Sequence, residues 1–416
     1  MNFYLITILA ILIGSYLLEL LVERLNLRNL KKELPAEFIG YYDRARYRKS
    51  QEYLVENTRF SLINSSIVTP VTVAFILLGG FNLVDRFARS FNLGTIVTGL
   101  VFTGVLLLAS QLLELPFSIY DTFVIEEKYG FNRTTAKTFI LDILKSWTLT
   151  GLVGGLALYL IIWFFESSGN RAWFYCWIIV TAFQLILAFL APVIIMPLFN
   201  KYTPLQKEDL RKEIEKYSKS QSFKIKGIYQ MDGSRRSTRS NAFFSGFGRF
   251  RRIVLFDTLI EKHTTAELVS VLAHEMGHYK KGHVWKSMIL SFFTFGLMFY
   301  ILSLFLNNRQ LFSAFRMEET SVYASLVFFG FLYGPIDTVL SIFSNMLSRR
   351  NEYAADSYAV KTYGNPGAMI EALKKLSVDN LSNLTPHPVK VFLSYSHPPI
   401  LERVRAIREM SSAGGS

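Results

Sequence analysis

The stretch of sequence that decides the fold is WFYCWIIVTAFQLILAFLAPVIIMPLF at residues 173–199, which contains no charged side chain. A helix of this length, rising 1.5 Å per residue, is about 40 Å long and can cross the roughly 30 Å of hydrocarbon in a bilayer. It also holds Cys176, the chain's single cysteine, so a disulfide framework and a thiolate metal cluster are excluded. The stretch predicts a transmembrane helix.

Six further apolar runs are long enough to span a membrane. They cover residues 2–22, 61–84, 95–120, 149–165, 287–306 and 321–346. Half of the 416 residues are hydrophobic (51%) and the mean hydropathy is +0.28, which excludes a disordered chain and disfavours a soluble one. The first run has no basic start and no small-residue cleavage site, so we expect a retained anchor. The predicted fold class is an all-α polytopic membrane protein with seven transmembrane helices.

The net charge of +13 follows the predicted topology. Seven spans place alternate connecting segments on opposite sides, and 40 of the 45 Lys and Arg residues fall on one side. That side comprises residues 23–60, 121–148, 200–286 and 347–416. The positive-inside rule therefore predicts an outside N-terminus and a cytoplasmic C-terminus. Because topology accounts for the charge, no nucleic-acid partner is expected.

Two cytoplasmic stretches are large enough to hold chemistry. The chain is expected to comprise residues 1–200 with helices one to five, a catalytic α+β portion at 201–285, helices six and seven at 286–346, and a C-terminal cytoplasmic segment at 347–416. No internal repeat or low-complexity linker divides them further.

The sequence HEMGH has the spacing of a zinc site on a helix. Thr264 and Glu267 form a capping-box signature ahead of it. A helix puts His274 and His278 on one face, where both can bind one Zn²⁺, with Glu275 beside them to take a proton from a metal-bound water. A structural zinc, or two hydrogen-bonded histidines in a core, would use the same residue types.

A catalytic zinc site needs a third protein ligand. The metzincin pattern would require Gly and His where Lys281 and Val284 stand, and His283 is one residue out of register. We expect His283 to be exposed or to support a ligand.

The third ligand is predicted after the seventh span, in the sequence NEYAAD. Glu352 is the candidate ligand, and Asp356 shares its helix face and can fix the tautomer of a ligand histidine. Two spans separate His278 from Glu352, so the chain returns to the side it left and the site lies at the membrane boundary. Taken alone, Glu352 could instead be a solvated helix charge.

Two other segments give weaker signals. Residues 251–256 are predicted to form a strand, and residues 225–231 are a weaker candidate. A strand beside the zinc helix could offer its backbone edge to a peptide, or it could lie in a small sheet without ligand contact. His397 and Arg403 flank a proline turn, where they either donate hydrogen bonds to an oxyanion or cap a helix as surface charges.

The motifs together resemble the type I CAAX prenyl proteases, which are integral-membrane zinc metallopeptidases. They are VLAHEMGHYKKGH at 271–283, SNAF at 240–243, RIVLFDTL at 252–259, NEYAAD at 351–356 and the segments 120–132, 197–204 and 394–403. The resemblance covers most of the chain.

The resemblance implies a fold, a site and an activity. One Zn²⁺ per chain would be bound by His274, His278 and Glu352, with Glu275 as general base, Asp356 supporting a ligand histidine, Asn241 holding the substrate backbone, and His397 and Arg403 facing the reacting carbonyl. The helices would form a barrel around a large intramembrane chamber with the zinc at its cytoplasmic end. The enzyme would release a C-terminal tripeptide after a prenylated cysteine. The implied partners are peptides or proteins, prenylated or membrane-bound, and the lipid bilayer.

Two alternatives stay open at this point. The short loops resemble those of a bacterial member of the family, which predicts a location in the bacterial inner membrane rather than the endoplasmic reticulum. A bacterial member could also be a metalloprotease for the quality control of membrane proteins, without prenyl specificity. A transporter or channel with a structural zinc is the alternative of another class, because Asp337 falls within an apolar span.

Overall fold

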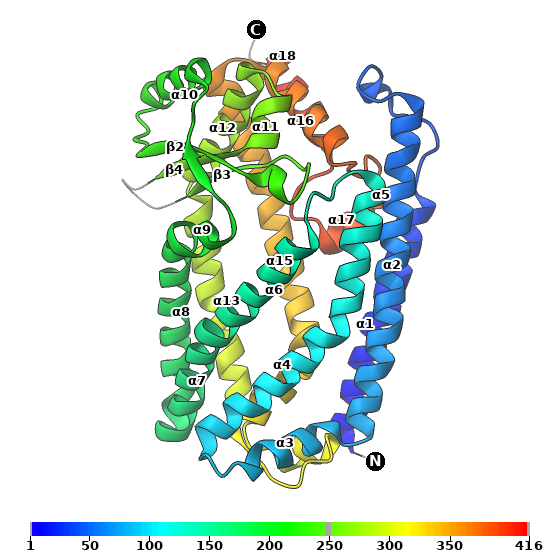
Figure 1. The fold of residues 1–416 in the computed structure, drawn as a ribbon, viewed down its shortest axis with the longest axis vertical. Coiled ribbons are helices and arrows are strands. Elements are labelled where there is room, and N and C mark those ends of the chain that lie inside the picture. The colour runs from blue at the N-terminus through cyan, green and yellow to red at the C-terminus, as the bar shows by residue number, and fades with distance from the viewer. Residues whose placement is uncertain (1, 246–250, 414–416) are drawn as a thin grey trace.

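Seven long helical segments run along the molecule in the computed structural model, which describes residues 2–245 and 251–413 (Figure 1). Within these residues, seven segments are long and apolar enough to cross a membrane, as predicted. They are α1 (Phe3–Arg28), α2 (Arg44–Leu77), α4 (Thr95–Tyr120) with its continuation to Tyr129, α6 (Ala136–Leu149) with α7 (Gly155–Ser167), α8 (Ala172–Leu190) with α9 (Met196–Phe199), α13 (His283–Phe305) and α15 (Val322–Tyr363).

The predicted second span, residues 61–84, is wrong at its end. α2 ends at Leu77, Gly79 has a left-handed backbone (φ +77°), and the separate helix α3 (Gly80–Ser90) follows. α3 lies across the end of the bundle near the N-terminus (Figure 1). Its Phe81 is buried in a cluster of aromatic side chains. The span therefore ends before α3, in which Phe81 packs against protein while Leu83 and Phe87 are exposed.

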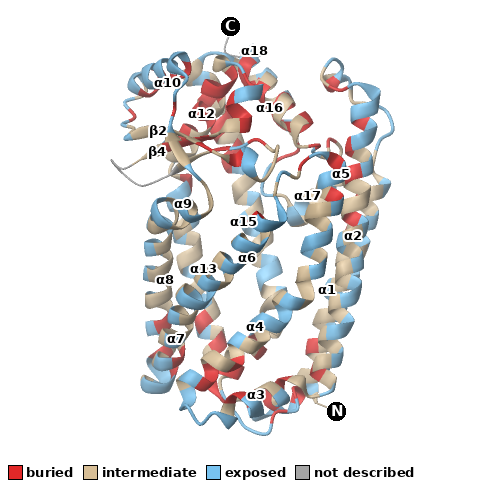
Figure 2. Cartoon of the chain, viewed as in Figure 1, coloured by how far each residue is buried: buried red, intermediate tan, exposed pale blue. Residues whose placement is uncertain are grey.

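Buried residues gather at the two ends of the bundle, while the middle of the long helices is mostly intermediate or exposed (Figure 2). In each of the seven segments, at most 17% of the most apolar window is buried. Most side chains in mid-bundle are therefore exposed or only partly covered by neighbouring helices.

A four-stranded sheet lies at the end of the bundle opposite the N-terminus (Figure 1). Its strands are β1 (Tyr202–Pro204), β2 (Gly227–Met231), β3 (Ala242–Ser245) and β4 (Arg252–Phe256), in the order β1-β2-β4-β3. β2 and β4 pair in parallel, and the other pairs are antiparallel. The strands predicted at 225–231 and 251–256 are confirmed as β2 and β4. Helices α10 (Glu208–Ser220), α11 (Asp257–Lys262) and α12 (Thr265–Lys280) complete this portion.

Two arginines join the sheet to the membrane helices. Arg236 donates from Nε and Nη2 to the two carboxylate oxygens of Asp142 in α6, at 2.7 and 3.0 Å. Arg239 donates from Nη2 to both oxygens of Glu126, at 2.8 and 3.1 Å. Both arginines precede β3, so charge-assisted hydrogen bonds fix the start of this strand relative to the spans.

Helix α12 packs tightly on the C-terminal part of α15. A Cβ added to Gly277 would lie 3.0 Å from the Cα and carbonyl oxygen of Ala355. Glycine therefore allows the two backbones to approach closely. Helices α16 (Pro366–Asp379), α17 (Pro388–Ser394) and α18 (Ile400–Ala413) surround this contact.

Candidate metal centre

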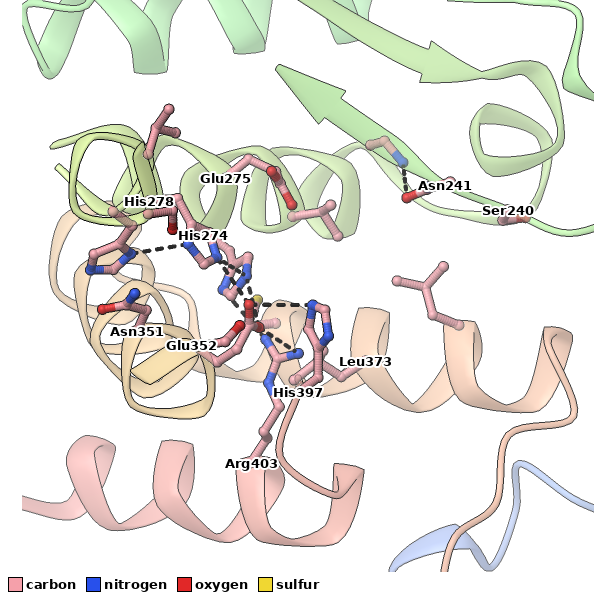
Figure 3. Close-up of a pocket in the computed structure, with 18 of the residues that line it drawn as sticks. Ser240, Asn241, His274, Glu275, His278, Asn351, Glu352, Leu373, His397 and Arg403 are labelled. Carbon is pink, nitrogen blue, oxygen red and sulfur yellow. Dashed lines mark hydrogen bonds and ion pairs between the residues drawn. The ribbon is translucent and has the colours of Figure 1, made fainter. Parts of the chain in front are cut away.

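Helix α12 presents two histidines on one face. It begins with the predicted capping box, in which Thr264 and Glu267 each accept a 3.3 Å hydrogen bond from the other's backbone N–H. The Nε2 atoms of His274 and His278, one turn apart, lie 3.1 Å from each other (Figure 3).

Helix α15 brings a carboxylate to the same point. Glu352 Oε1 lies 3.2 Å from His278 Nε2, and Glu352 Oε2 lies 3.4 Å from His274 Nε2. Glu352 is 3% exposed, so the reading as a solvated helix charge is wrong. The three side chains offer one ligand atom each within a 4.8 Å group.

The spacing of these atoms fits a tetrahedral ion. Ligands about 2.0–2.1 Å from a tetrahedral zinc lie about 3.3 Å from one another. Here the two histidine Nε2 atoms are 3.1 Å apart, and each lies 3.2–3.4 Å from one of the two carboxylate oxygens of Glu352. Glu352 Oε2 is buried and forms no hydrogen bond with any residue in the described ranges. A nitrogen and oxygen donor set of this kind suits zinc.

Asp356 lies behind the three ligand atoms and fixes the orientation of His274. Its Oδ1 is 2.7 Å from His274 Nδ1, and its side chain is fully buried. When His274 Nδ1–H donates to this carboxylate, the Nε2 lone pair points toward the other two ligands. Arg403 donates to Asp356 through Nε (2.9 Å) and Nη2 (2.6 Å) and so balances the buried negative charge.

A cavity of about 710 Å³ opens beside these side chains. It is lined by Glu275, Asn241 and His397 among others, so the structure brings together all eight residues singled out from the sequence. Glu275 points toward the side of Asn241 in Figure 3. Burial raises the pKa of the Glu275 carboxyl above its ordinary value. Burial lowers the pKa of His274, but its hydrogen bond to Asp356 and its close contact with the Glu352 carboxylate raise this pKa to about 9 overall.

The edge of the sheet beside the cavity is β3. The predicted strand at 251–256 is β4, which lies inside the sheet and has its two neighbours already paired. Asn241 immediately precedes β3; its Oδ1 accepts from the Ala242 N–H (2.8 Å) and its carbonyl accepts from the Phe256 N–H (3.1 Å). Among the described strands, the sheet edge near the cavity is therefore β3, for which the sequence pattern gave no strand prediction.

His397 and Arg403 have different surroundings. The His397 side chain is 65% exposed, and its Nε2 lies 3.3 Å from Glu352 Oε1. Arg403 is buried, and its guanidinium contacts Asp356 and Glu352 (3.3 Å). The reading of Arg403 as a surface charge is wrong, because two buried carboxylates hold it in the interior.

Two residues of the site were missed or left open. His283 is buried, and its Nδ1 lies 3.0 Å from His278 Nδ1, so of the two alternatives it supports a ligand. Gln184 in α8 also lines the cavity. A polar side chain inside the charge-free run 173–199 was a usable signal, because such groups usually face a polar interior.

Comparisons with known proteins cover nearly the whole chain. A family model for the CAAX prenyl protease N-terminal region with five membrane helices matches residues 23–201, and one for peptidase family M48 matches residues 204–411. The crystal structure of Ste24p from S. mikatae superposes with a TM-score of 0.92 at 31% identity, covering 97% of this chain and 99% of that one.

Curated relatives carry related names. The probable CAAX prenyl protease 1 of Schizosaccharomyces pombe is 36% identical and covers 97% of this chain and 88% of its own length. The CAAX prenyl protease 1 homolog of Oryza sativa is 34% identical over 98% of both chains. The homolog of Homo sapiens is 32% identical, with 91% of this chain and 89% of its own covered.

Proposed function

The chain belongs to the M48 family of peptidases and is a multi-pass membrane metallopeptidase, and from that premise we propose how its residues hydrolyse a peptide bond. His274, His278 and Glu352 hold one zinc ion. The observation that carries this proposal is the convergence of one ligand atom from each of the three side chains within 4.8 Å, beside an open cavity. Bound zinc supplies a Lewis acid that polarises the scissile carbonyl and makes water a better nucleophile.

Glu275 acts as the general base. It accepts a proton from the attacking water as the new C–O bond forms, and donates it to the amine nitrogen as the C–N bond breaks. Its position next to His274 and its free access to the cavity support this role. A carboxyl whose pKa is raised by burial is better matched to proton transfer near neutral pH.

The substrate lies in extended form along β3. An unpaired strand edge can hydrogen-bond an added peptide strand, and Asn241 at the start of β3 orients the nearest substrate group. His397 donates a hydrogen bond to the oxyanion, as its exposure at the cavity allows. Arg403, held by Asp356 and Glu352, is proposed as a positioning residue, which revises the expectation that it faces the carbonyl.

The substrate class is proposed from the relatives. Proteins named CAAX prenyl protease 1 cover nearly the full chain, so we propose that this enzyme removes a C-terminal tripeptide after a prenylated cysteine. The sparse packing in mid-bundle supports an interior chamber that receives the isoprenoid. The site is proposed to face the cytoplasm. The relatives named above are eukaryotic, so the predicted bacterial membrane gains no support from them.

The metal and base roles are tested together. Detergent-purified protein should contain one zinc per chain and cleave a farnesylated CAAX peptide, and a chelator should abolish cleavage. Glu275→Ala should keep the zinc and lose at least about a thousandfold in kcat. Wild-type cleavage by a zinc-loaded Glu275→Ala protein would disprove the base role.

Prenyl recognition is tested separately from peptidase chemistry. The farnesylated peptide should have a higher kcat/KM than the same peptide without the farnesyl group, because burial of the isoprenoid gains about 0.8 kcal/mol per CH₂. Equal rates would favour the alternative, a quality-control protease of membrane proteins. Membership of a peptidase family leaves the transporter alternative without support.

A further inference from the structure

A second pocket, here named the cationic pocket, opens where α12, α13 and α15 meet. Its volume is about 390 Å³, and Lys281, Lys286 and Arg350 line it. His283 and Asn351 line both this pocket and the cavity of the metal centre. The cationic pocket is therefore a neighbour of the catalytic site with a chemistry of its own.

The three cations of this pocket have no acidic partner among the described residues. Lys281, Lys286 and Arg350 are exposed, and none of them forms an ion pair with a residue in the described ranges. No acidic residue is among the described residues that line the pocket. Elsewhere on the same end of the molecule, cations such as Lys128 and Arg408 are paired with glutamates. The pocket therefore concentrates positive charge that an anion can neutralise.

Backbone and side-chain donors add to these charges. α13 begins at His283 beside the pocket, and its N-cap, Gly282, provides no side-chain acceptor for the first N–H groups. The positive end of this 23-residue helix therefore points to the same region. Asn351 is only 8% exposed, and its side chain forms no hydrogen bond that involves another described residue. This amide is therefore free to bind a ligand that enters the pocket.

The pocket lies at the boundary of the membrane. The apolar run of α13 begins at residue 287, and that of α15 ends at residue 346, each within a few residues of the pocket. Next to it along these two helices, the apolar side chains of Ile289, Phe343 and Met346 are exposed. Exposed Trp285 has the position expected of an interfacial aromatic residue. Cationic and apolar surfaces are thus stacked in the same order as the head and tails of a phospholipid.

We propose that the cationic pocket binds the phosphate of an anionic phospholipid, with acyl chains along α13 and α15. The lysines, Arg350 and the α13 N–H groups contact the phosphate, and the Asn351 amide contacts a headgroup oxygen. This proposal goes beyond the peptidase activity, since none of the three cations takes part in the hydrolysis.

Binding is tested on the full chain in detergent. Delipidated protein is titrated with phosphatidylserine or phosphatidylcholine, and bound lipid is counted by native mass spectrometry. We expect one tightly bound phosphatidylserine and a preference over phosphatidylcholine of about tenfold. A cation near an anionic lipid strengthens binding roughly fivefold. The triple variant Lys281→Gln, Lys286→Gln, Arg350→Gln should therefore lose at least about tenfold in phosphatidylserine affinity.

Two controls separate the pocket from general charge and from folding. The triple variant Lys207→Gln, Lys224→Gln, Lys361→Gln removes the same charge from exposed positions outside the pocket and should bind as wild type. Lys281→Arg, Lys286→Arg keeps the charge and should also bind. Wild-type affinity in the first triple variant would overturn the proposal. Displacement of the lipid by millimolar inorganic phosphate would overturn it too, because it would assign the pocket to the free ion.

Discussion

His274 binds a metal well only in one tautomer, and a single buried carboxylate selects it. The 2.7 Å contact between His274 Nδ1 and Asp356 keeps the proton on Nδ1 and leaves Nε2 for the metal. Arg403 neutralises Asp356, since an unpaired charge in this buried position would be costly. The ligand set therefore depends on a chain of contacts from α18 to α12.

Replacing Asp356 by Asn should lower zinc affinity or kcat/KM by 10–100-fold. The amide keeps the size of the carboxylate but loses the charge that holds the His274 proton. Zinc retention against a chelator and kcat/KM for the farnesylated peptide give the two measurements. Asp209→Asn, at an exposed position in α10, is the matched control and should leave both unchanged. Full zinc affinity and activity in Asp356→Asn would contradict this role.

At the scale of elements, the contact between α12 and α15 sets the position of the ligands. His274 and His278 lie on α12, Glu352 lies on α15, and Gly277 is where the two backbones approach. The distance between the helices at Gly277 therefore determines the distance between the donor atoms.

The substitution Gly277→Ala should separate the two helices. Its Cβ would meet backbone atoms of Ala355 at 3.0 Å, and overpacking of this kind costs about 1–3 kcal/mol. We expect a lower melting temperature together with reduced zinc affinity. Gly330→Ala in α15, with nothing within 4 Å of the added Cβ, is the control. If both variants keep zinc equally well, the helix spacing does not control the site.

The start of α12 should make stability depend on pH. His263 is buried, its Nδ1 lies 3.0 Å from Glu267 Oε2, and burial lowers the pKa of His263. Below pH 6.5 the unfolded chain binds a proton at His263 that the folded chain binds less readily. The free energy of unfolding therefore decreases as the pH is lowered. The pKa of Glu267 lies below its ordinary value, so its contribution is lost only at more acidic pH.

Melting temperatures at pH 7.5 and 5.5 test this linkage. His263→Asn keeps a donor for Glu267 but cannot titrate, so its loss of stability between the two pH values should be smaller than that of wild type. An equal loss in both proteins would mean that other groups account for the pH dependence.

The local sequence pattern was sufficient to predict most helices and strands, but it did not predict the contacts between them. The capping box and the four-residue spacing of His274 and His278 are properties of one helix, so the sequence was sufficient to predict them. The contact of Arg403 with Asp356 joins residues 47 apart, and no periodicity encodes it. Composition could not separate α3 from a span, because the turn at Gly79 interrupts the helix while apolar residues continue on both sides of it. The sheet order likewise depends on long-range pairing, which placed β3 at the edge.

At the scale of the whole molecule, seven spans put the two chain ends on opposite sides, and Figure 1 places N and C at opposite ends of the bundle.

Cysteine labelling can test the predicted orientation of the chain in the membrane. Cys176 is buried, so we expect the wild-type chain to react little with the maleimide. In sealed vesicles whose cytoplasmic face is inside, Ser90→Cys should react with an impermeant maleimide added outside. Ser220→Cys and Ser411→Cys should react only after permeabilisation. Labelling of Ser220→Cys from outside would reverse the orientation.

Helix α15 is continuous from the seventh span to the third ligand. With 42 residues it is about 63 Å long, so Glu352 is attached to a rod whose other end is immersed in lipid. Helices tilt to match the thickness of the bilayer, and a tilt of about 5° moves a point roughly 30 Å along the rod by about 2.6 Å. Such a displacement approaches the separation of the ligand atoms themselves. We therefore expect bilayer thickness to change the position of Glu352 relative to His274 and His278, and the proteolytic rate to differ between thin and thick bilayers.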